Sequence, residues 1–409
     1  MMRAASRKIA LKPECPVYLS GYAGDTRLHS TTSVHDAPMA VALLLEVDNR
    51  KLLFLELDVL AVEEERIAPL KKDIASRLHM DPDDLIVSAV HSHSLPSGFF
   101  ADPFSDKSDT GFYDQVLRDL PGALEGLDEQ LQECEALYSR CKVHGYYSKR
   151  SDITAPFDDE ALVIRFVHDN ENIAAILKIS CHGTVLGPDN MDVTVDFLGA
   201  IRDGLAKEIG VTPYTVTGAS GDISNRQYRQ GNDFRELERV SKGVLQILSE
   251  GLKEWKPLHL AAPKIESWSY GIDYDCRPNY PQYRQALEKA QAVMEDPGSS
   301  FDEKKLARTE IYVMKERLEQ EHVSFTVKGR VIHMGELTIA TFPGELASIF
   351  GLQLKEACPN DCFLLIGYCD DYQGYFIEED EYGKTYETVA TLTPKGEPEK
   401  ICTLIKEKL

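Results

Sequence analysis

The sequence predicts an α/β fold in which central β-sheets are flanked by layers of helices. Short apolar runs typical of buried strands alternate along the chain with segments whose apolar residues recur at helical spacing. The 409 residues are enough to bury a large core, and no internal repeat or low-complexity tract divides them. We therefore expect residues 1–409 to form a single domain with the sheets inside and the helices outside.

In the first half of the chain, the apolar runs 39–47 and 52–62 flank the turn signal Asp48-Asn49-Arg50, which indicates a pair of adjacent strands. Further strands are predicted at residues 85–90, 161–167, 173–180 and 214–218. Two stripes at helical spacing indicate helices that pack on the sheets. The first stripe comprises Phe197, Ile201, Leu205 and Ile209, and the second comprises Leu237, Val240, Val244, Leu245 and Leu248.

In the second half, residues 281–322 are strongly charged and favour helix, with one interruption at Asp296-Pro297-Gly298. This pattern predicts an inserted antiparallel helical hairpin, which is either a lid or a solvated surface element. Strands are expected to resume at residues 323–327, 331–334, 337–342 and 363–367.

The composition narrows the possible partners. Lys and Arg number 45 against 67 for Asp and Glu, a formal net charge of −22, which argues against nucleic acid or an anionic membrane. The nine cysteines are odd in number and show no C-x-x-C spacing, as expected of reduced thiols. Neither a signal-peptide core nor an apolar run of about 18 residues is present. We expect a cytoplasmic protein.

The histidines of His91-Ser92-His93 are the first candidates for chemistry. They follow the apolar run Leu85-Ile86-Val87-Ser88-Ala89-Val90 directly. Side chains at i and i+2 of an extended segment point to the same face, so both imidazoles would enter one cavity and suit a metal ion or a ligand. The alternative is a pair of solvated loop histidines.

Four further residues stand at the ends of predicted strands or in loops that follow them. His182 follows a strand and is itself followed by glycine, and Ser224 lies in the small-residue loop after residue 217. Glu345 follows Phe342-Pro343-Gly344 and is either an oxygen ligand or a residue that favours the helix dipole. Tyr386 is either a site residue or an ordinary surface tyrosine.

Together these motifs resemble the neutral/alkaline (non-lysosomal) ceramidase family and the shorter proteins related to its N-terminal catalytic domain. The resemblance is carried by His91-Ser92-His93-Ser94, the later His182, Gly221-Asp222-Ile223-Ser224, Phe342-Pro343-Gly344-Glu345 and Tyr386-Glu387 with Thr391, in this order. It also includes Leu19-Ser20-Gly21-Tyr22 and Asp196-Phe197-Leu198-Gly199, and so covers most of residues 15–395.

The resemblance implies one Zn²⁺ ion and a set of residues around it. The implied metal ligands are His91, His182, Glu345 and Tyr386. The implied catalytic residues are His93, Ser224, Arg150 and Tyr386. In these roles His93 moves a proton, Arg150 and Tyr386 stabilise an oxyanion, and Ser224 acts either as a hydrogen-bond donor, the role we favour, or as a covalent nucleophile.

The implied reaction is zinc-assisted hydrolysis of an amide bond in a small N-acyl substrate. The sequence departs from the ceramidases where Leu95 replaces a glycine and where Asn225 replaces the proline that usually follows the serine. The ceramidases also continue into a further β-domain. A smaller acylated amine or a cyclic amide is therefore as compatible with the sequence as ceramide. Two alternatives remain: hydrolysis of an ester or another acyl compound at the same zinc site, and a binding protein that keeps the fold without activity.

Overall fold

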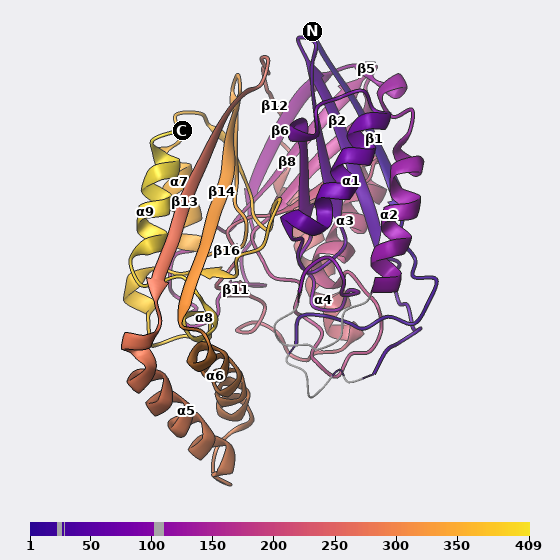
Figure 1. The fold of residues 1–409 in the computed structure, drawn as a ribbon. Coiled ribbons are helices and arrows are strands. Elements are labelled where there is room, and N and C mark those ends of the chain that lie inside the picture. Colours follow the sequence, from indigo (N-terminus) through magenta and orange to yellow (C-terminus); the bar gives the residue numbers. More distant parts are fainter. Residues whose placement is uncertain (23–26, 28, 102–109) are drawn as a thin grey trace.

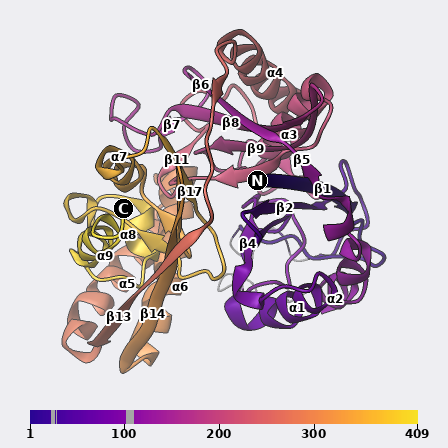
Figure 2. The same ribbon diagram turned by 90° about the horizontal axis from the view of Figure 1, so that it is seen from above.

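Three β-sheets surround a common core, and a pair of helices covers the outer side of each sheet (Figure 1, Figure 2). The structure is a computed structural model that describes residues 1–22, 27, 29–101 and 110–409. The predicted α/β class with flanking helices is confirmed. Among the described residues, none of the helices combines the length and the apolar character needed to cross a bilayer. A cytoplasmic location stays a prediction.

The first sheet has the strand order β4-β3-β2-β1-β5. Its strands are β1 (Met2–Ala10), β2 (Met39–Val47), β3 (Arg50–Leu57), β4 (Leu85–Ala89) and β5 (Gln132–Glu133). Helices α1 (Glu64–Arg77) and α2 (Thr110–Leu124) cover it. Asp48 and Asn49 form the tight turn between β2 and β3 with φ of 49° and 67°, values that suit the twist of a two-residue hairpin. The predicted strand pair is confirmed, although β3 ends at Leu57 rather than at residue 62.

Strand β2 is apolar except at Glu46 because both of its faces are buried. Side chains of successive residues point to opposite faces of a sheet. Ala40, Ala42 and Leu44 pack with the covering helices, whereas Val41, Leu43 and Leu45 enter the core between the sheets.

The second sheet has the order β10-β9-β8-β6-β12. Its strands are β6 (Glu135–Lys142), β8 (Glu160–His168), β9 (Glu171–Ile179), β10 (Tyr214–Thr217) and β12 (Lys256–Pro257). Helices α3 (Asp196–Ile209) and α4 (Phe234–Gly251) cover it through the two apolar stripes expected from the sequence.

The third sheet has the order β13-β14-β15-β17. Its strands are β13 (Lys264–Asp275), β14 (His322–Met334), β15 (Leu337–Thr341) and β17 (Cys362–Ile366). Helices α7 (Ser348–Ala357) and α9 (Glu397–Lys406) lie on its outer side. The single strand β14 spans the two strands predicted at residues 323–327 and 331–334.

Helices α5 (Tyr280–Glu295) and α6 (Phe301–Glu319) occupy the segment in which the sequence predicts a helical hairpin. They connect the long strands β13 and β14 and extend beyond the end of that sheet, next to α8 (Tyr386–Ala390) (Figure 1). The smaller elements are the pair β7 (Ser148–Lys149) and β11 (Ile223–Ser224) and the pair β16 (Glu345–Leu346) and β18 (Tyr375–Phe376).

Each sheet contains one parallel strand pair, and these pairs determine where the site forms. The pairs are β3 with β4, β9 with β10, and β15 with β17. Inner side chains from all three sheets form one apolar cluster, so the sheets are held together along their length. The loops after β4, β9 and β15 meet at one end of this core, which is where ligand sites of α/β proteins form.

Candidate metal centre

Each sheet supplies one candidate ligand to a common point. His91 follows β4, His182 follows β9, and Glu345 begins β16 just after β15. The donor nitrogens of His91, His93 and His182 all lie within 4.8 Å of one another. The Glu345 carboxylate reaches into the same cluster, with Oε2 2.8 Å from His182 Nε2 and Oε1 3.8 Å from His91 Nε2.

A main-chain carbonyl fixes the tautomer of each imidazole. The Nδ1 atoms lie 2.7 Å from the Leu60 oxygen for His91, 2.6 Å from the Gly21 oxygen for His93 and 2.8 Å from the Ser220 oxygen for His182. A carbonyl only accepts hydrogen bonds, so each Nδ1 carries the proton and each Nε2 keeps its lone pair. This arrangement orients a histidine as a metal ligand.

The Nε2 atoms of His91 and His93 are buried and have no hydrogen-bond partner among the described residues. A buried nitrogen without a hydrogen-bond partner destabilises the folded protein unless a ligand, a water or a metal ion interacts with it. Burial is the main cause that lowers the pKa of His91 and of His182 to about 3, and it also lowers the pKa of His93 well below its usual value. Neutral imidazoles with free lone pairs and one carboxylate form a donor set that fits a zinc ion.

His91 adopts a backbone conformation that is unusual for a non-glycine residue. Its φ is 60°, and its amide donates to the Val59 carbonyl at 3.1 Å. The imidazole stacks on the ring of Tyr368, with 3.9 Å between centroids. Such a conformation costs on the order of 1–3 kcal/mol and persists only where the surroundings enforce it. The stack and the Leu60 carbonyl provide this enforcement.

Two tyrosines that the sequence reasoning missed hold Glu345. The Tyr372 hydroxyl donates to Glu345 Oε1 at 2.5 Å, and Tyr375 makes a second side-chain hydrogen bond to the carboxylate. Burial raises the pKa of Glu345, while the neighbouring His91, Tyr372 and Arg150 act in the opposite direction. The only signal in the sequence was the density of tyrosines after residue 367.

Tyr386 lies close to this group. It opens α8, its ring meets that of Tyr375 edge-on at 6.2 Å, and burial followed by the charge of Glu345 raises its pKa to about 12. Tyr372 and Tyr375 contact the Glu345 carboxylate directly. The assignment of Tyr386 as a metal ligand stays a prediction.

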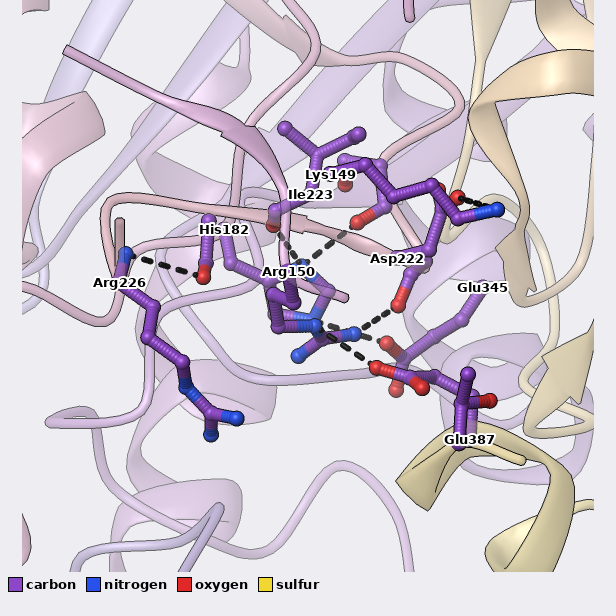
Figure 3. Close-up of polar contacts among 12 residues, drawn as sticks. Lys149, Arg150, His182, Asp222, Ile223, Arg226, Glu345 and Glu387 are labelled. Carbon is purple, nitrogen blue, oxygen red and sulfur yellow. Dashed lines mark hydrogen bonds and ion pairs between the residues drawn. The ribbon is translucent and has the colours of Figure 1, made fainter. Parts of the chain in front are cut away.

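Arg150 is held by a carboxylate that the sequence reasoning also missed. Its Nε lies 2.8 Å from Glu387 Oε1, and its Nη2 donates to the Gly221 carbonyl. Figure 3 shows the guanidinium beside Glu387 and Asp222, close to His182 and Glu345. Burial raises the pKa of Glu387, but the charge of Arg150 and other contacts more than offset this effect, so the pKa is low. Both charges are present in the folded protein.

Ser224 is buried on β11, which pairs with β7 just before Arg150. Its hydroxyl accepts from the Arg226 amide at 3.3 Å. The preceding carbonyl, that of Ile223, lies 3.1 Å from His182 Nδ1. Ser224 therefore directly follows Ile223, whose carbonyl helps to orient His182. The catalytic role of Ser224 stays a prediction.

The full chain resembles two solved structures. One is a neutral ceramidase from Pseudomonas aeruginosa, with a TM-score of 0.71 and 16% identity, and the match covers 100% of this chain and 75% of that one. The other is a ceramidase complexed with C2, with a TM-score of 0.69 and 15% identity over 100% and 76% of the two chains. No family model and no curated protein matches the sequence. At these identities the likeness shows the fold, and the chain therefore has the fold of the neutral ceramidase structures.

Proposed function

We propose that this protein is a zinc-dependent hydrolase that cleaves the amide bond of a small N-acyl substrate. One observation carries the proposal: three imidazoles with fixed tautomers converge on one point beside a buried carboxylate, and two of their lone pairs are unpartnered among the described residues. Three neutral imidazoles grouped around the Glu345 carboxylate are typical of a metal site. A site for an uncharged organic ligand would not require this set of donor atoms.

His91, His182 and Glu345 would hold the ion, with Tyr386 as the fourth residue of the set. Tyr372 and Tyr375 are the alternatives to Tyr386, because they contact Glu345. When bound, zinc supplies Lewis acidity that makes water a better nucleophile at neutral pH and polarises the acyl carbonyl.

His93 is suited to proton transfer. Its Nδ1 is anchored on the Gly21 carbonyl, which leaves the lone pair of Nε2 as the reactive site. Nε2 would take a proton from the attacking water and then deliver it to the nitrogen of the departing amine. Its pKa, lowered by burial, favours the neutral form that can accept this proton.

Arg150 and Tyr386 would stabilise the negative charge that develops on the acyl oxygen. Placed donors of this kind contribute about 3 kcal/mol each to transition-state stabilisation. Glu387 holds the guanidinium in place, so little reorganisation is needed during the reaction. Ser224 would donate a hydrogen bond that positions the water or, in the alternative, would attack the carbonyl itself.

The two structural relatives suggest which substrates to test first. Both are structures of ceramidases, so an N-acyl sphingosine is the first substrate to test, beside smaller N-acyl amines. Ester hydrolysis passes through a similar tetrahedral intermediate, and the same residues would serve it.

The test is metal content by elemental analysis, combined with hydrolysis of matched N-acyl aminocoumarin and O-acyl umbelliferone substrates. We expect near-stoichiometric zinc in the parent, and loss of both zinc and activity in His91→Ala and His182→Ala. The control is His168→Ala, because His168 is an exposed histidine of β8 whose Nδ1 also lies on a carbonyl, that of Glu133, at 2.6 Å. A parent that takes up no zinc when supplied with it would overturn the proposal. Zinc without hydrolysis of either series would favour a binding protein.

A further inference from the structure

We propose that the α5–α6 hairpin is a positioning element of the catalytic centre, because Thr309 of α6 sets the place of Tyr386 on α8. The inference rests on the proposed function in that Tyr386 is one of the reacting groups. It assigns to the hairpin a role beyond that of a solvated surface element.

Helix α8 cannot hold its own position. It has five residues and begins without a side-chain hydrogen bond at its N-terminal cap, Thr385. Isolated helices far shorter than about 12 residues are unstable in water, so contacts with the rest of the protein must fix it. Its first two residues are Tyr386 and Glu387, the partner of Arg150. Whatever fixes α8 therefore fixes two groups of the centre.

Helix α6 provides contacts at the end of α8. The Arg317 guanidinium donates to the Thr391 carbonyl and, at 3.4 Å, to the Val389 carbonyl. The last carbonyls of a helix lack partners within it, and a cation there also interacts favourably with the helix dipole. Arg317 thus caps α8 from the hairpin.

Thr309, two helical turns before Arg317, reaches the start of α8. Its side chain is hydrogen-bonded to that of Tyr386, and the residue is only 3% exposed. Thr309 thus contacts the first residue of α8, and Arg317 contacts carbonyls at its end. Loss of the Thr309 hydroxyl would leave the buried phenol short of a partner, which favours a different side-chain position.

The contact continues from Tyr386 to the candidate metal ligands. The Tyr386 ring meets the Tyr375 ring at an interplanar angle of 86°, and Tyr375 is hydrogen-bonded to Glu345. Displacement of α8 would therefore move an oxyanion donor and disturb the support of a ligand. A hairpin that served only as a solvated surface element would have no reason to bury a hydroxyl against this tyrosine.

The test compares Thr309→Val, which removes the hydroxyl at nearly constant size, with Thr309→Ser, which keeps it. Each is made in the parent and in Tyr386→Phe, and kcat and KM are measured with an N-acyl aminocoumarin on the zinc-loaded protein. We expect Thr309→Val to lower kcat about 10-fold with little change in KM, because misplacement of a catalytic group affects the transition state most. Thr309→Ser should restore most of kcat. In Tyr386→Phe, Thr309→Val should have no further effect.

The control is Thr403→Val on α9, whose hydroxyl is bonded within its own helix to the Glu399 carbonyl. Equal losses of kcat from Thr309→Val in the parent and in Tyr386→Phe would overturn the inference, and so would no loss in either. If the parent hydrolyses nothing, the proposed function fails, and hydrogen exchange of residues 385–391 decides the inference alone. Faster exchange in Thr309→Val but not in Thr403→Val supports it, and unchanged exchange overturns it.

Discussion

Replacement of Glu387 by glutamine removes the negative charge that pairs with Arg150 and preserves the size of the side chain. The two side chains are 6% and 14% exposed, and their charged atoms lie 2.8 Å apart. Removal of one member of a buried ion pair costs about 3–5 kcal/mol, because the remaining charge stays desolvated without compensation. Arg150 keeps its bond to the Gly221 carbonyl. We therefore expect the lower end of that range, a loss of about 3 kcal/mol in the free energy of unfolding.

The reciprocal variant and the double variant sharpen this prediction. Arg150→Met leaves Glu387 buried alone, and its pKa then rises from its present low value because burial is no longer opposed by the guanidinium. That variant should be least stable at high pH and should recover as the pH falls and Glu387 takes up a proton. The double variant leaves no unpaired charge, so it should lose less stability than the two single variants combined.

The assay is equilibrium unfolding in urea with a chelator present, so that metal binding does not contribute. The matched control is Glu238→Gln, which breaks the exposed pair of Glu238 and Lys242, whose side chains are 62% and 74% exposed. Exposed pairs contribute little, so this variant should retain the parent's stability almost unchanged. A loss below about 1 kcal/mol in Glu387→Gln would refute the reasoning, because it would mean that solvent or the neighbouring Asp222 and Glu345 carboxylates compensate the Arg150 charge.

Three further predictions concern the centre and the core beneath it. Zinc at about 1,000 times its dissociation constant should stabilise the parent by about 4 kcal/mol in urea unfolding, but not His182→Ala; equal stabilisation of both would exclude the site. Gly221→Ala places a Cβ 2.5 Å from the Glu345 carbonyl oxygen and should weaken zinc binding in a chelator competition, whereas Gly122→Ala meets no atom within 4 Å and should not. Burial opposes ionisation of Asp158, but the Lys178 charge outweighs it and holds the pKa low. The stabilisation is therefore present above the ordinary pKa of about 4 and lost as the pH falls below it. In Asp158→Asn, the stability measured by circular dichroism should therefore fall less steeply as the pH is lowered through this range than it does in the parent. An equally steep fall in both proteins would contradict this.

The sequence predicted those parts of the fold whose signal is local. Strands β2, β4 and β9 are mostly apolar because both of their faces are largely buried, and α3 and α4 display clear stripes. Candidate ligands could be found for the same reason. His91 and His182 each follow such a run, and the end of a buried strand is a position where a polar side chain is conspicuous.

The rest depends on contacts between segments that are distant in sequence. Nothing local specifies that three sheets close around one core, or that Tyr372 and Tyr375 contact Glu345. Glu387 was missed because its partner, Arg150, is distant in sequence and follows β7, whereas Glu387 lies on α8. Strand β13 is a different case, since Trp268, Tyr270, Ile272 and Tyr274 alternate with small or acidic residues and give a period-2 signal that was missed.

The spacing of the candidate ligands along the chain has a consequence for the order of synthesis and assembly. His182 and Glu345 are separated by 163 residues, and His91, His182 and Glu345 follow strands of three different sheets. Contacts between such distant segments form late in folding, since long loops must close first. A chain still emerging from the ribosome therefore carries histidines but no complete binding site until its last third has been made. Zinc uptake at this site would mark the completion of folding.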